Sequence, residues 1–428
     1  MMHEAQRIAS GVVRRVVRGR SLDAELAAAL RAHPGASPQQ RALIRDLSFG
    51  TLRWLGEIDV VLEGLLAKPL TDERVRALLR VGLYQLAHCR GAEHAVVDHA
   101  VRACERLGAG TAKTLVNAVL RTFLRRREPV MAQARRTEGA RFSYPQWWIE
   151  KLHAQYPEDY ARILDIGNSH PPLTLRVNRR RATVEGYLGL LLEHGIPARD
   201  LGGSAVGLER PRPVERIPGF GEGLVSVQDA AAQFAAPLLD AAPGQRVLDA
   251  CAAPGGKACH LLELADVELV ALDTDDARLE RLRANFSRLG LDGRAICGDA
   301  TASEDWWDGR EFDRILADVP CSGSGVVRRH PDMKWLRRPA DIAQFALRQQ
   351  SILRVLWRLL ARGGKLLYAT CSLFHEENHA QVAAFLERHG DAVQLTPPAK
   401  HDGSRPAPGL WLPDERHDGF FYALLQKS

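Results

Sequence analysis

Two cysteines directly follow predicted strands, in segments that could carry nucleophilic chemistry. Cys321 lies in the segment Asp318-Val319-Pro320-Cys321-Ser322-Gly323-Ser324-Gly325, and Cys371 lies in Ala369-Thr370-Cys371-Ser372. A single cysteine in a reduced protein is most often a small buried hydrophobe. Two cysteines at the ends of neighbouring strands, one of them preceded by proline and followed by glycines, favour covalent catalysis by a thiolate instead.

A thiolate suits a reaction that an unactivated pyrimidine does not undergo. Carbon 5 of cytosine is not nucleophilic enough to attack a methylsulfonium, but addition of a thiolate at carbon 6 converts the ring into a reactive enamine. Asp318 could assist by protonation or hydrogen bonding at N3. After methyl transfer the carbon-5 proton and the thiol must leave, and a second thiol could assist that step. This chemistry alone does not decide which cysteine attacks.

A turn of small residues earlier in the chain could bind the methyl donor. Residues 247–257 read as a strand end, a turn and a helix start, where backbone N–H groups can bind a carboxylate. The turn matches neither the dinucleotide fingerprint nor a Walker A loop. Asp273 ends the next strand, where an acid can take both ribose hydroxyls of an adenosine, and Asp299 follows the third strand, placed to accept from an adenine amino group. Either acid alone could be a helix N-cap, but the three turns in register predict an S-adenosylmethionine site.

The elements that must position these residues alternate between strand and helix from Gln228 onward. This alternation predicts a doubly wound, mostly parallel sheet with its ligand crevice at the carboxyl ends of the strands. No clear helix separates the last strand from the strand before it. The last strand can therefore lie antiparallel to the others in the sheet. The predicted strands are Arg246–Ala250, Leu269–Asp273, Ala295–Cys297, Arg314–Asp318, Lys365–Thr370, Val393–Leu395 and Gly419–Leu425.

The front of the chain has a different pattern and a different charge. Residues 1–130 carry apolar side chains at helical spacing, and residues 145–230 mix helix and strand signals, which predicts a small α+β insert. Residues 1–135 hold 22 Lys/Arg against 13 Asp/Glu. This excess suggests a polyanion-binding module, although arginine-rich surfaces have other causes and charge alone leaves the partner open.

Bulk composition limits the class of protein. The chain has 428 residues, enough for two or three domains, and 26% of them are charged. No apolar run is long enough to span a membrane, and the first residues do not form a signal peptide. The seven cysteines are scattered without a C-x-x-C pair, so we expect a reducing cytoplasm, no disulfide framework and no metal site.

The motifs together resemble the RsmB/Sun (Fmu) family of bacterial 16S ribosomal RNA cytosine-5 methyltransferases. The resemblance spans the whole chain and rests on residues 253–257, 318–323 and 369–372, with further matches at Gln228-Asp229 and Asp418-Gly419-Phe420-Phe421. One local departure is Val319, where the family often has alanine. The resemblance implies that Cys371 is the nucleophile, that Cys321 assists release of the adduct and that Asp318 contacts cytosine N3. It also implies that the cofactor is held by Cys251, Ala252, Ala253, Pro254, Gly255, Gly256, Lys257, Asp273, Asp299 and Asp318.

The same resemblance implies three domains. These are an all-α NusB-like RNA-binding domain at 1–135, a small α+β RNA-recognition-like domain at 136–225, and a C-terminal α/β Rossmann-like class I methyltransferase domain at 226–428. We therefore expect a multidomain, monomeric enzyme that uses S-adenosyl-L-methionine. Its expected partner is 16S ribosomal RNA, free or in a small-subunit precursor, with no membrane and no metal.

Two other functions fit parts of the sequence. A DNA cytosine-5 methyltransferase would use Cys321 as its nucleophile, but it would need neither the cysteine at 371 nor the helical front. A non-catalytic RNA-binding or antitermination factor would explain residues 1–130, but not the intact cysteine pair and the three cofactor acids. Transfer of radiolabel from S-adenosylmethionine to RNA or to DNA separates these hypotheses.

Overall fold

The computed structural model describes residues 2–396 and 409–428, and the chain divides into two compact units. The first unit comprises Met1–His170 and Val327–Pro339, and the second comprises Pro171–Val326 and Ala340–Ser428. Within the described ranges, no helix is both long and apolar enough to cross a membrane.

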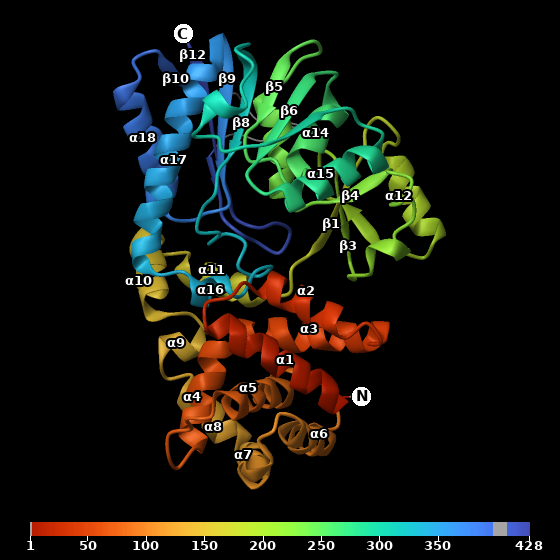
Figure 1. Cartoon of the computed structure of the whole chain (residues 1–428), viewed down its shortest axis with the longest axis vertical. Coiled ribbons are helices and arrows are strands. Elements are labelled where there is room, and N and C mark those ends of the chain that lie inside the picture. The colour runs from red at the N-terminus through yellow and green to blue at the C-terminus, as the bar shows by residue number, and fades with distance from the viewer. Residues whose placement is uncertain (1, 397–408) are drawn as a thin grey trace. The chain divides into compact units, whose positions relative to one another are not determined.

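The first unit is helical, as the spacing of apolar residues predicts (Figure 1). Helix α1 (Met2–Val17) buries one stripe of side chains against α3 (Pro38–Arg53), α5 (Glu73–His88) and α6 (Glu93–Arg106). The stripe recurs every three or four residues, which matches the helical period. It consists of Ala5, Ile8, Ala9, Val12, Val13 and Val16.

The remaining helices of this bundle follow in sequence order. Trp54 separates two of them, because it caps the end of α3 and the start of α4. The others are α2 (Leu22–Ala32), α4 (Leu55–Leu65), α7 (Lys113–Arg125) and α8 (Arg127–Ala134).

The helical unit extends beyond residue 135. It includes α9 (Glu138–Arg141), α10 (Gln146–Gln155), α11 (Tyr160–Asn168) and the later segment 327–339. The sequence interpretation assigned these helices to the insert and the later segment to the methyltransferase domain. Packing explains the difference, because Lys334 of the later segment bonds Ser143 and Asn168, and Ala140 and Trp335 belong to the core of the helical bundle.

Lys334 lies at the centre of these contacts and is fully buried. Its Nζ donates to the carbonyl oxygens of Arg53 at 2.7 Å and Ser143 at 2.9 Å, and to Oδ1 of Asn168 at 2.8 Å. The same nitrogen lies 4.2 Å from the centre of the Tyr144 ring. Burial lowers the pKa of Lys334 well below its usual range, and the nearby Arg53 charge lowers it further. This one side chain therefore connects α16 (Met333–Leu336) to three other parts of the helical unit.

The second unit begins with a four-stranded antiparallel sheet and one helix. The strand order is β2-β3-β1-β4, with β1 (Leu173–Val177) between β3 (Ala205–Leu208) and β4 (Val225–Val227). Strand β2 (Ala198–Asp200) forms the other edge, and α12 (Val184–Glu193) packs against β2 and β3. This is the small α+β fold that the sequence predicts.

The larger sheet has the predicted doubly wound arrangement. Its eight strands run in the order β10-β12-β9-β8-β5-β6-β7, with β11 paired to β12. Strands β5 to β9 are parallel, and β12 enters antiparallel to β9. The strands are β5 (Arg246–Asp249), β6 (Glu268–Asp273), β7 (Arg294–Cys297), β8 (Phe312–Asp318), β9 (Leu360–Thr370), β10 (Ala392–Leu395), β11 (Gly409–Trp411) and β12 (Phe420–Lys427).

Helices cover both faces of this sheet (Figure 1). On one face, side chains of α17 (Pro339–Leu359) and α18 (His379–Arg388) share a core with the strands. The crossovers through α14 (Gly256–Leu264) and α15 (Asp276–Leu289) run in the opposite direction along the sheet, so right-handed connections place them on the other face. The carboxyl ends of β5, β6, β8 and β9 therefore meet at one edge, where the ligand crevice is expected.

Replacing Lys334 with methionine tests its contacts in the helical unit. Lys334→Met leaves three buried acceptors without their donor, so the free energy of unfolding should fall by about 1–3 kcal/mol. This change is measured by urea denaturation of the full chain, monitored by a spectroscopic signal from the helical unit. Lys68 is exposed, and Lys68→Met should leave stability within about 0.5 kcal/mol of the parent. Equal stability of both variants would contradict the structural role of Lys334.

Candidate active site

The strand register brings the predicted site residues to one edge of the large sheet. Asp249 ends β5 and pairs with Ala271 of β6, while Asp318 ends β8 and pairs with Ala369 of β9. Thr370 then ends β9, so Cys371 is the first residue beyond the sheet. The acids and the cysteines lie up to 122 residues apart in the sequence (Asp249 to Cys371), and the parallel pairing of the strands brings their ends together.

The turn after β5 is braced by the acid that ends β6. Asp273 is buried, and its two oxygens accept hydrogen bonds from the backbone amides of Ala253 and Asp275, each at 3.1 Å. Gly255 adopts a positive φ of 101° directly before α14, a conformation that favours glycine. The predicted cofactor residues 251–257 therefore form a tight turn that ends at the N-terminus of a helix, where a carboxylate group is stabilised.

Asp299 is the third predicted cofactor acid, and its surroundings differ from those of Asp273. Its Oδ1 accepts hydrogen bonds from the backbone amide and the hydroxyl of Thr301, each at 2.8 Å. These bonds lower the pKa of Asp299, so it is a carboxylate at neutral pH. The half-exposed side chain forms a local cap after β7, and Arg348 lies 3.9 Å from its second oxygen.

Asp249 is a functional candidate that sequence reasoning missed. Its side chain is buried at the end of β5, and neither carboxylate oxygen has a hydrogen-bond partner of good geometry among the described residues. Burial and the nearby charge of Asp318 raise the pKa of Asp249 to about 7. A buried acid without a partner at a ligand crevice fits contact with a polar or cationic ligand. The acid directly precedes the small-residue turn, so its position in the sequence was the available signal.

Lys257 and Asp318 form an ion pair between the cofactor turn and the segment that contains Cys321. Lys257 Nζ lies 2.6 Å from Asp318 Oδ2 and 5.2 Å from the centre of the Phe420 ring. Burial disfavours the ammonium form, but the attraction of Asp318 exceeds this effect and raises the pKa of Lys257. Lys257 therefore stays charged at neutral pH and donates to the Asp318 carboxylate, whose oxygens can accept further hydrogen bonds.

The two predicted thiols lie in direct contact. Cys321 Sγ is 3.3 Å from Cys371 Sγ, both side chains are partly exposed, and neither forms a disulfide. Hydrogen bonding to Cys371 and burial hold the pKa of Cys321 well above its usual range, and the carboxylate of Glu377 adds to this effect. Cys321 therefore favours its protonated form, and its S–H group can donate to the sulfur of Cys371.

Glu377 is a second residue that sequence reasoning missed. It is fully buried, and its oxygens accept from the backbone amide of Ser322 at 2.8 Å, from the Ser372 hydroxyl at 2.5 Å and from Gln349 Nε2 at 3.1 Å. The hydroxyls of Ser322, Ser324 and Ser372 also contact one another at 3.1–3.2 Å. Both cysteines are thus followed by a serine that is bound to the same carboxylate. Glu377 lies six residues beyond Cys371 in an unremarkable acidic pair, so its spacing carried no signal.

Backbone hydrogen bonds also hold together the two loops that carry Cys321 and Cys371. The Gly325 amide donates to the Cys371 carbonyl at 2.8 Å, and the Gly419 amide donates to the Gly325 carbonyl at 2.9 Å. A Cβ at Gly325 would lie 2.3 Å from the Gly419 carbonyl oxygen, so the close approach requires glycine. The backbone amide of Asp418 also donates to both oxygens of Asp229 at 3.1 Å, which joins two motifs from the sequence analysis.

Comparisons with known families agree with this geometry. Residues 236–426 match the model of the 16S rRNA methyltransferase RsmB/F family. Residues 3–125 match the NusB family, and residues 144–215 match the RsmF/B-like ferredoxin-like domain. Three family models thus follow one another along the chain, in the order that the fold shows.

Individual proteins match over nearly the whole chain. Ribosomal RNA small subunit methyltransferase B of Vibrio cholerae is 43% identical over 400 residues, which cover 91% of this chain and 90% of that protein. The protein of the same name from Pseudomonas putida is 46% identical over 397 residues, 91% of each chain. A solved methyltransferase homolog from Pyrococcus horikoshii has a TM-score of 0.57 at 27% identity, and covers 68% of this chain and 97% of its own.

One assignment follows from the order of the domains, from the doubly wound sheet and from the extent of these matches. The chain belongs to the ribosomal RNA small subunit methyltransferase B family and is an S-adenosylmethionine-dependent methyltransferase.

Proposed function

We propose that this protein methylates carbon 5 of cytosine 967 in 16S ribosomal RNA through a covalent bond between Cys371 and carbon 6 of the base. The observation that carries the proposal is the contact between two thiols at the carboxyl edge of the sheet, 3.3 Å apart, beside a Lys257–Asp318 ion pair. The names of the relatives support ribosomal RNA as the substrate. In bacteria this activity belongs in the cytoplasm.

The first step is attack by the Cys371 thiolate. A bond forms between its sulfur and carbon 6, and the electron pair of the C5–C6 double bond becomes available at carbon 5. Cys321 is the better hydrogen-bond donor of the pair because it retains its proton, so it stabilises negative charge on Cys371. Asp318, an acceptor held by Lys257, is suited to stabilise a proton on N3 of the ring, which favours the addition.

The second step needs a methyl donor held beside carbon 5. S-adenosylmethionine, when bound, supplies an electrophilic methyl group on a sulfonium. Residues 251–257, Asp273 and Asp299 would hold it, and the buried unpartnered carboxylate of Asp249 indicates that this crevice is built for a ligand with polar or cationic groups. The ribose hydroxyls would use the remaining lone pairs of Asp273.

The last step restores the aromatic ring. The carbon-5 proton passes to water, the electron pair of that C–H bond re-forms the C5–C6 double bond, and the electron pair of the C6–S bond leaves with the Cys371 sulfur. The Cys321 S–H group lies 3.3 Å from that sulfur and is therefore placed to hydrogen-bond it as it leaves. Glu377 positions both thiols through Ser322 and Ser372 and contacts no reacting atom.

The front of the chain supplies RNA affinity in this proposal. We assign residues 1–135 and 136–225 to RNA binding and residues 226–428 to catalysis. The excess of Lys/Arg over Asp/Glu within 1–135 supports contacts to phosphates, which give affinity without reading sequence.

Removing the Asp273 carboxylate should weaken cofactor binding. Asp273→Ala deletes the proposed acceptor of the ribose hydroxyls and the brace of the turn at Ala253, so affinity for S-adenosylmethionine should fall by about 1–3 kcal/mol. Isothermal titration calorimetry measures the change. Asp266 is exposed on the same unit, and Asp266→Ala should bind the cofactor as the parent does. Unchanged affinity in Asp273→Ala would remove this residue from the site.

The two thiols should divide the reaction between them. Cys371→Ala should abolish methylation and form no protein–RNA crosslink, because the attacking sulfur is gone. Cys321→Ala should attack and transfer the methyl group, then stall as an adduct that survives denaturing electrophoresis and disappears in the double variant. Cys297 is an exposed cysteine that ends β7 of the same sheet, and Cys297→Ala should retain full activity. A stable adduct in Cys371→Ala, with none in Cys321→Ala, would make Cys321 the nucleophile.

A further inference from the structure

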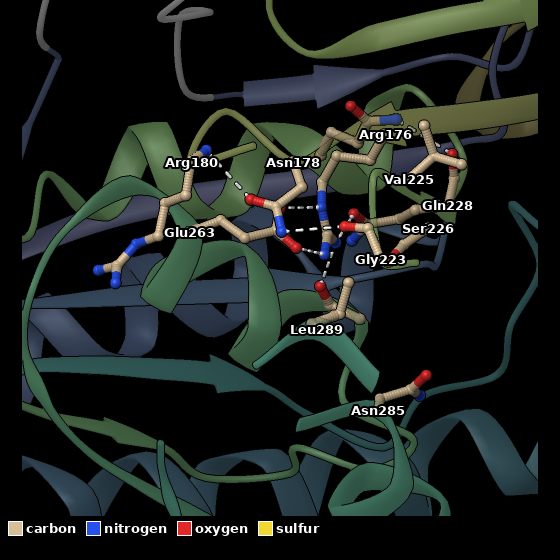
Figure 2. Close-up of polar contacts among 12 residues, drawn as sticks. Arg176, Asn178, Arg180, Gly223, Val225, Ser226, Gln228, Glu263, Asn285 and Leu289 are labelled. Carbon is tan, nitrogen blue, oxygen red and sulfur yellow. Dashed lines mark hydrogen bonds and ion pairs between the residues drawn. The ribbon is translucent and has the colours of Figure 1, made fainter. Parts of the chain in front are cut away.

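Strand β1 of the insert carries a buried arginine on the face that points away from the insert's own core. Leu175 and Val177 belong to that core. Successive side chains of a strand point to opposite faces, so Arg176 between them lies on the other face. Figure 2 shows Arg176 reaching Glu263 of α14, with both side chains at 1% exposure or less and contacts of 2.7 and 2.8 Å. The insert thus buries one of its own charges against a helix of the methyltransferase domain.

The same guanidinium also bonds the cofactor turn. Its Nη1 donates to Oε1 of Gln228 and to the carbonyl oxygen of Gly256, the first residue of α14. A trans peptide group holds its C=O and N–H in opposite directions, so a bond to the Gly256 carbonyl also fixes the direction of the Lys257 N–H. That amide is one of the first N–H groups of α14, which have no acceptor within the helix. Gly256 and Lys257 are both partly exposed, so a ligand can reach this part of the turn.

Helix geometry explains how one side chain reaches both partners on α14. Glu263 follows Gly256 by seven residues, so the two lie on the same face of the helix. Helical side chains lean toward the N-terminus, which brings the Glu263 carboxylate back toward the turn. The planar fork of arginine uses separate nitrogens for the two contacts, which a single amine cannot do. A simple ion pair would not need the bond to Gly256, so the choice of arginine serves the turn as well.

Helix α15 contacts the same turn. Arg278 Nη2 donates to the carbonyl oxygen of Ala253. Asn285, seven residues later on the same helical face, donates from Nδ2 to the carbonyl oxygen of Pro254 at 3.1 Å. Near the end of α15, Arg288 donates to two backbone carbonyl oxygens of the insert at 2.7 and 3.0 Å. The insert therefore holds the turn directly and also supports the second helix that contacts it.

We propose that Arg176 is a positioning residue of the cofactor site, although it belongs to the insert and is too deeply buried to touch the cofactor. The inference rests on the proposed placement of S-adenosylmethionine at residues 251–257. By holding the Gly256 carbonyl, Arg176 keeps the Lys257 amide directed at the carboxylate of the bound cofactor. The insert then has two tasks, because the domain that we assign to RNA binding also completes the cofactor turn.

Two variants remove the buried ion pair, and only one of them removes the contact with the turn. Glu263→Gln leaves the bond from Arg176 to Gly256 in place, so the cofactor should bind as in the parent even though the melting temperature falls. Arg176→Met/Glu263→Met removes both buried charges and keeps their volume, so it should melt no lower than Glu263→Gln. Isothermal titration calorimetry on the full chain should nevertheless show an affinity for S-adenosylmethionine about tenfold weaker in this double variant, the effect of one lost charged hydrogen bond.

Arg180 supplies a matched control for the loss of an arginine between the insert and α14. It is an exposed arginine of the insert, and its Nη2 donates to the Ala265 carbonyl at the opposite end of α14. Arg180→Met should therefore bind the cofactor as the parent does. In methylation assays, the double variant should raise the KM for S-adenosylmethionine about tenfold and keep kcat within about twofold. If cofactor affinity follows the melting temperature across all three variants, Arg176 has only a structural role and the proposal is overturned.

Further variants keep every outcome informative. If the double variant does not fold, Arg176→Lys replaces it, because lysine keeps the charge beside Glu263 but loses the separate bond to the turn. Parent affinity in Arg176→Lys would then overturn the proposal. Asp273→Ala in the same titration tests the cofactor placement. If only Asp273→Ala loses affinity, the Arg176 inference fails and the placement stands. If Asp273→Ala and the double variant both bind as the parent does, the placement fails and the inference fails with it.

Discussion

The buried carboxylate of Glu377 is the interaction on which the catalytic geometry depends. It binds the residue after each cysteine, through the Ser322 amide and the Ser372 hydroxyl. Because a buried carboxylate without partners would be costly, the two loops are stable only when both reach it. The 3.3 Å contact between the thiols follows from that shared anchor, and the same negative charge helps Cys321 to keep its proton. One side chain thus anchors both loops and favours the protonated form of Cys321.

A second buried charge connects the insert with the cofactor turn. Arg176 lies on the strand that the insert contributes, yet it binds Glu263 and the Gly256 carbonyl of α14, the helix that begins at the cofactor turn. Buried ion pairs contribute specificity of arrangement more dependably than net stability. This pair fixes the insert relative to the cofactor turn within the second unit.

The sequence predicted the strand ends well, because alternating strands and helices leave few arrangements for a parallel sheet. Cys371, Asp273 and Asp318 could be placed at the edge of the sheet because each ends or directly follows a strand, and Cys321 lies three residues beyond β8. Glu377 could not be picked out, since a buried partner is defined by folded neighbours and not by spacing in the chain.

The sequence pattern also could not predict which residues belong to the helical unit. Residues 327–339 follow the Cys321 loop, and nothing in their periodicity indicates that Lys334 lies among helices formed by the first 170 residues. The three acceptors of Lys334 come from positions 53, 143 and 168, so only long-range packing could reveal the contact. Contacts of this kind are set by tertiary structure, which local propensity does not encode.

The central claim is that Cys371 attacks the base, and trapping the adduct on the unmodified protein tests it most directly. A 16S fragment whose target cytosine carries fluorine at carbon 5 cannot lose that substituent as a proton, so the adduct cannot resolve. After incubation with S-adenosylmethionine and proteolysis, mass spectrometry should find the nucleotide attached to the peptide that contains Cys371. A nucleotide on the peptide that contains Cys321, or no attached nucleotide on either, would contradict the account.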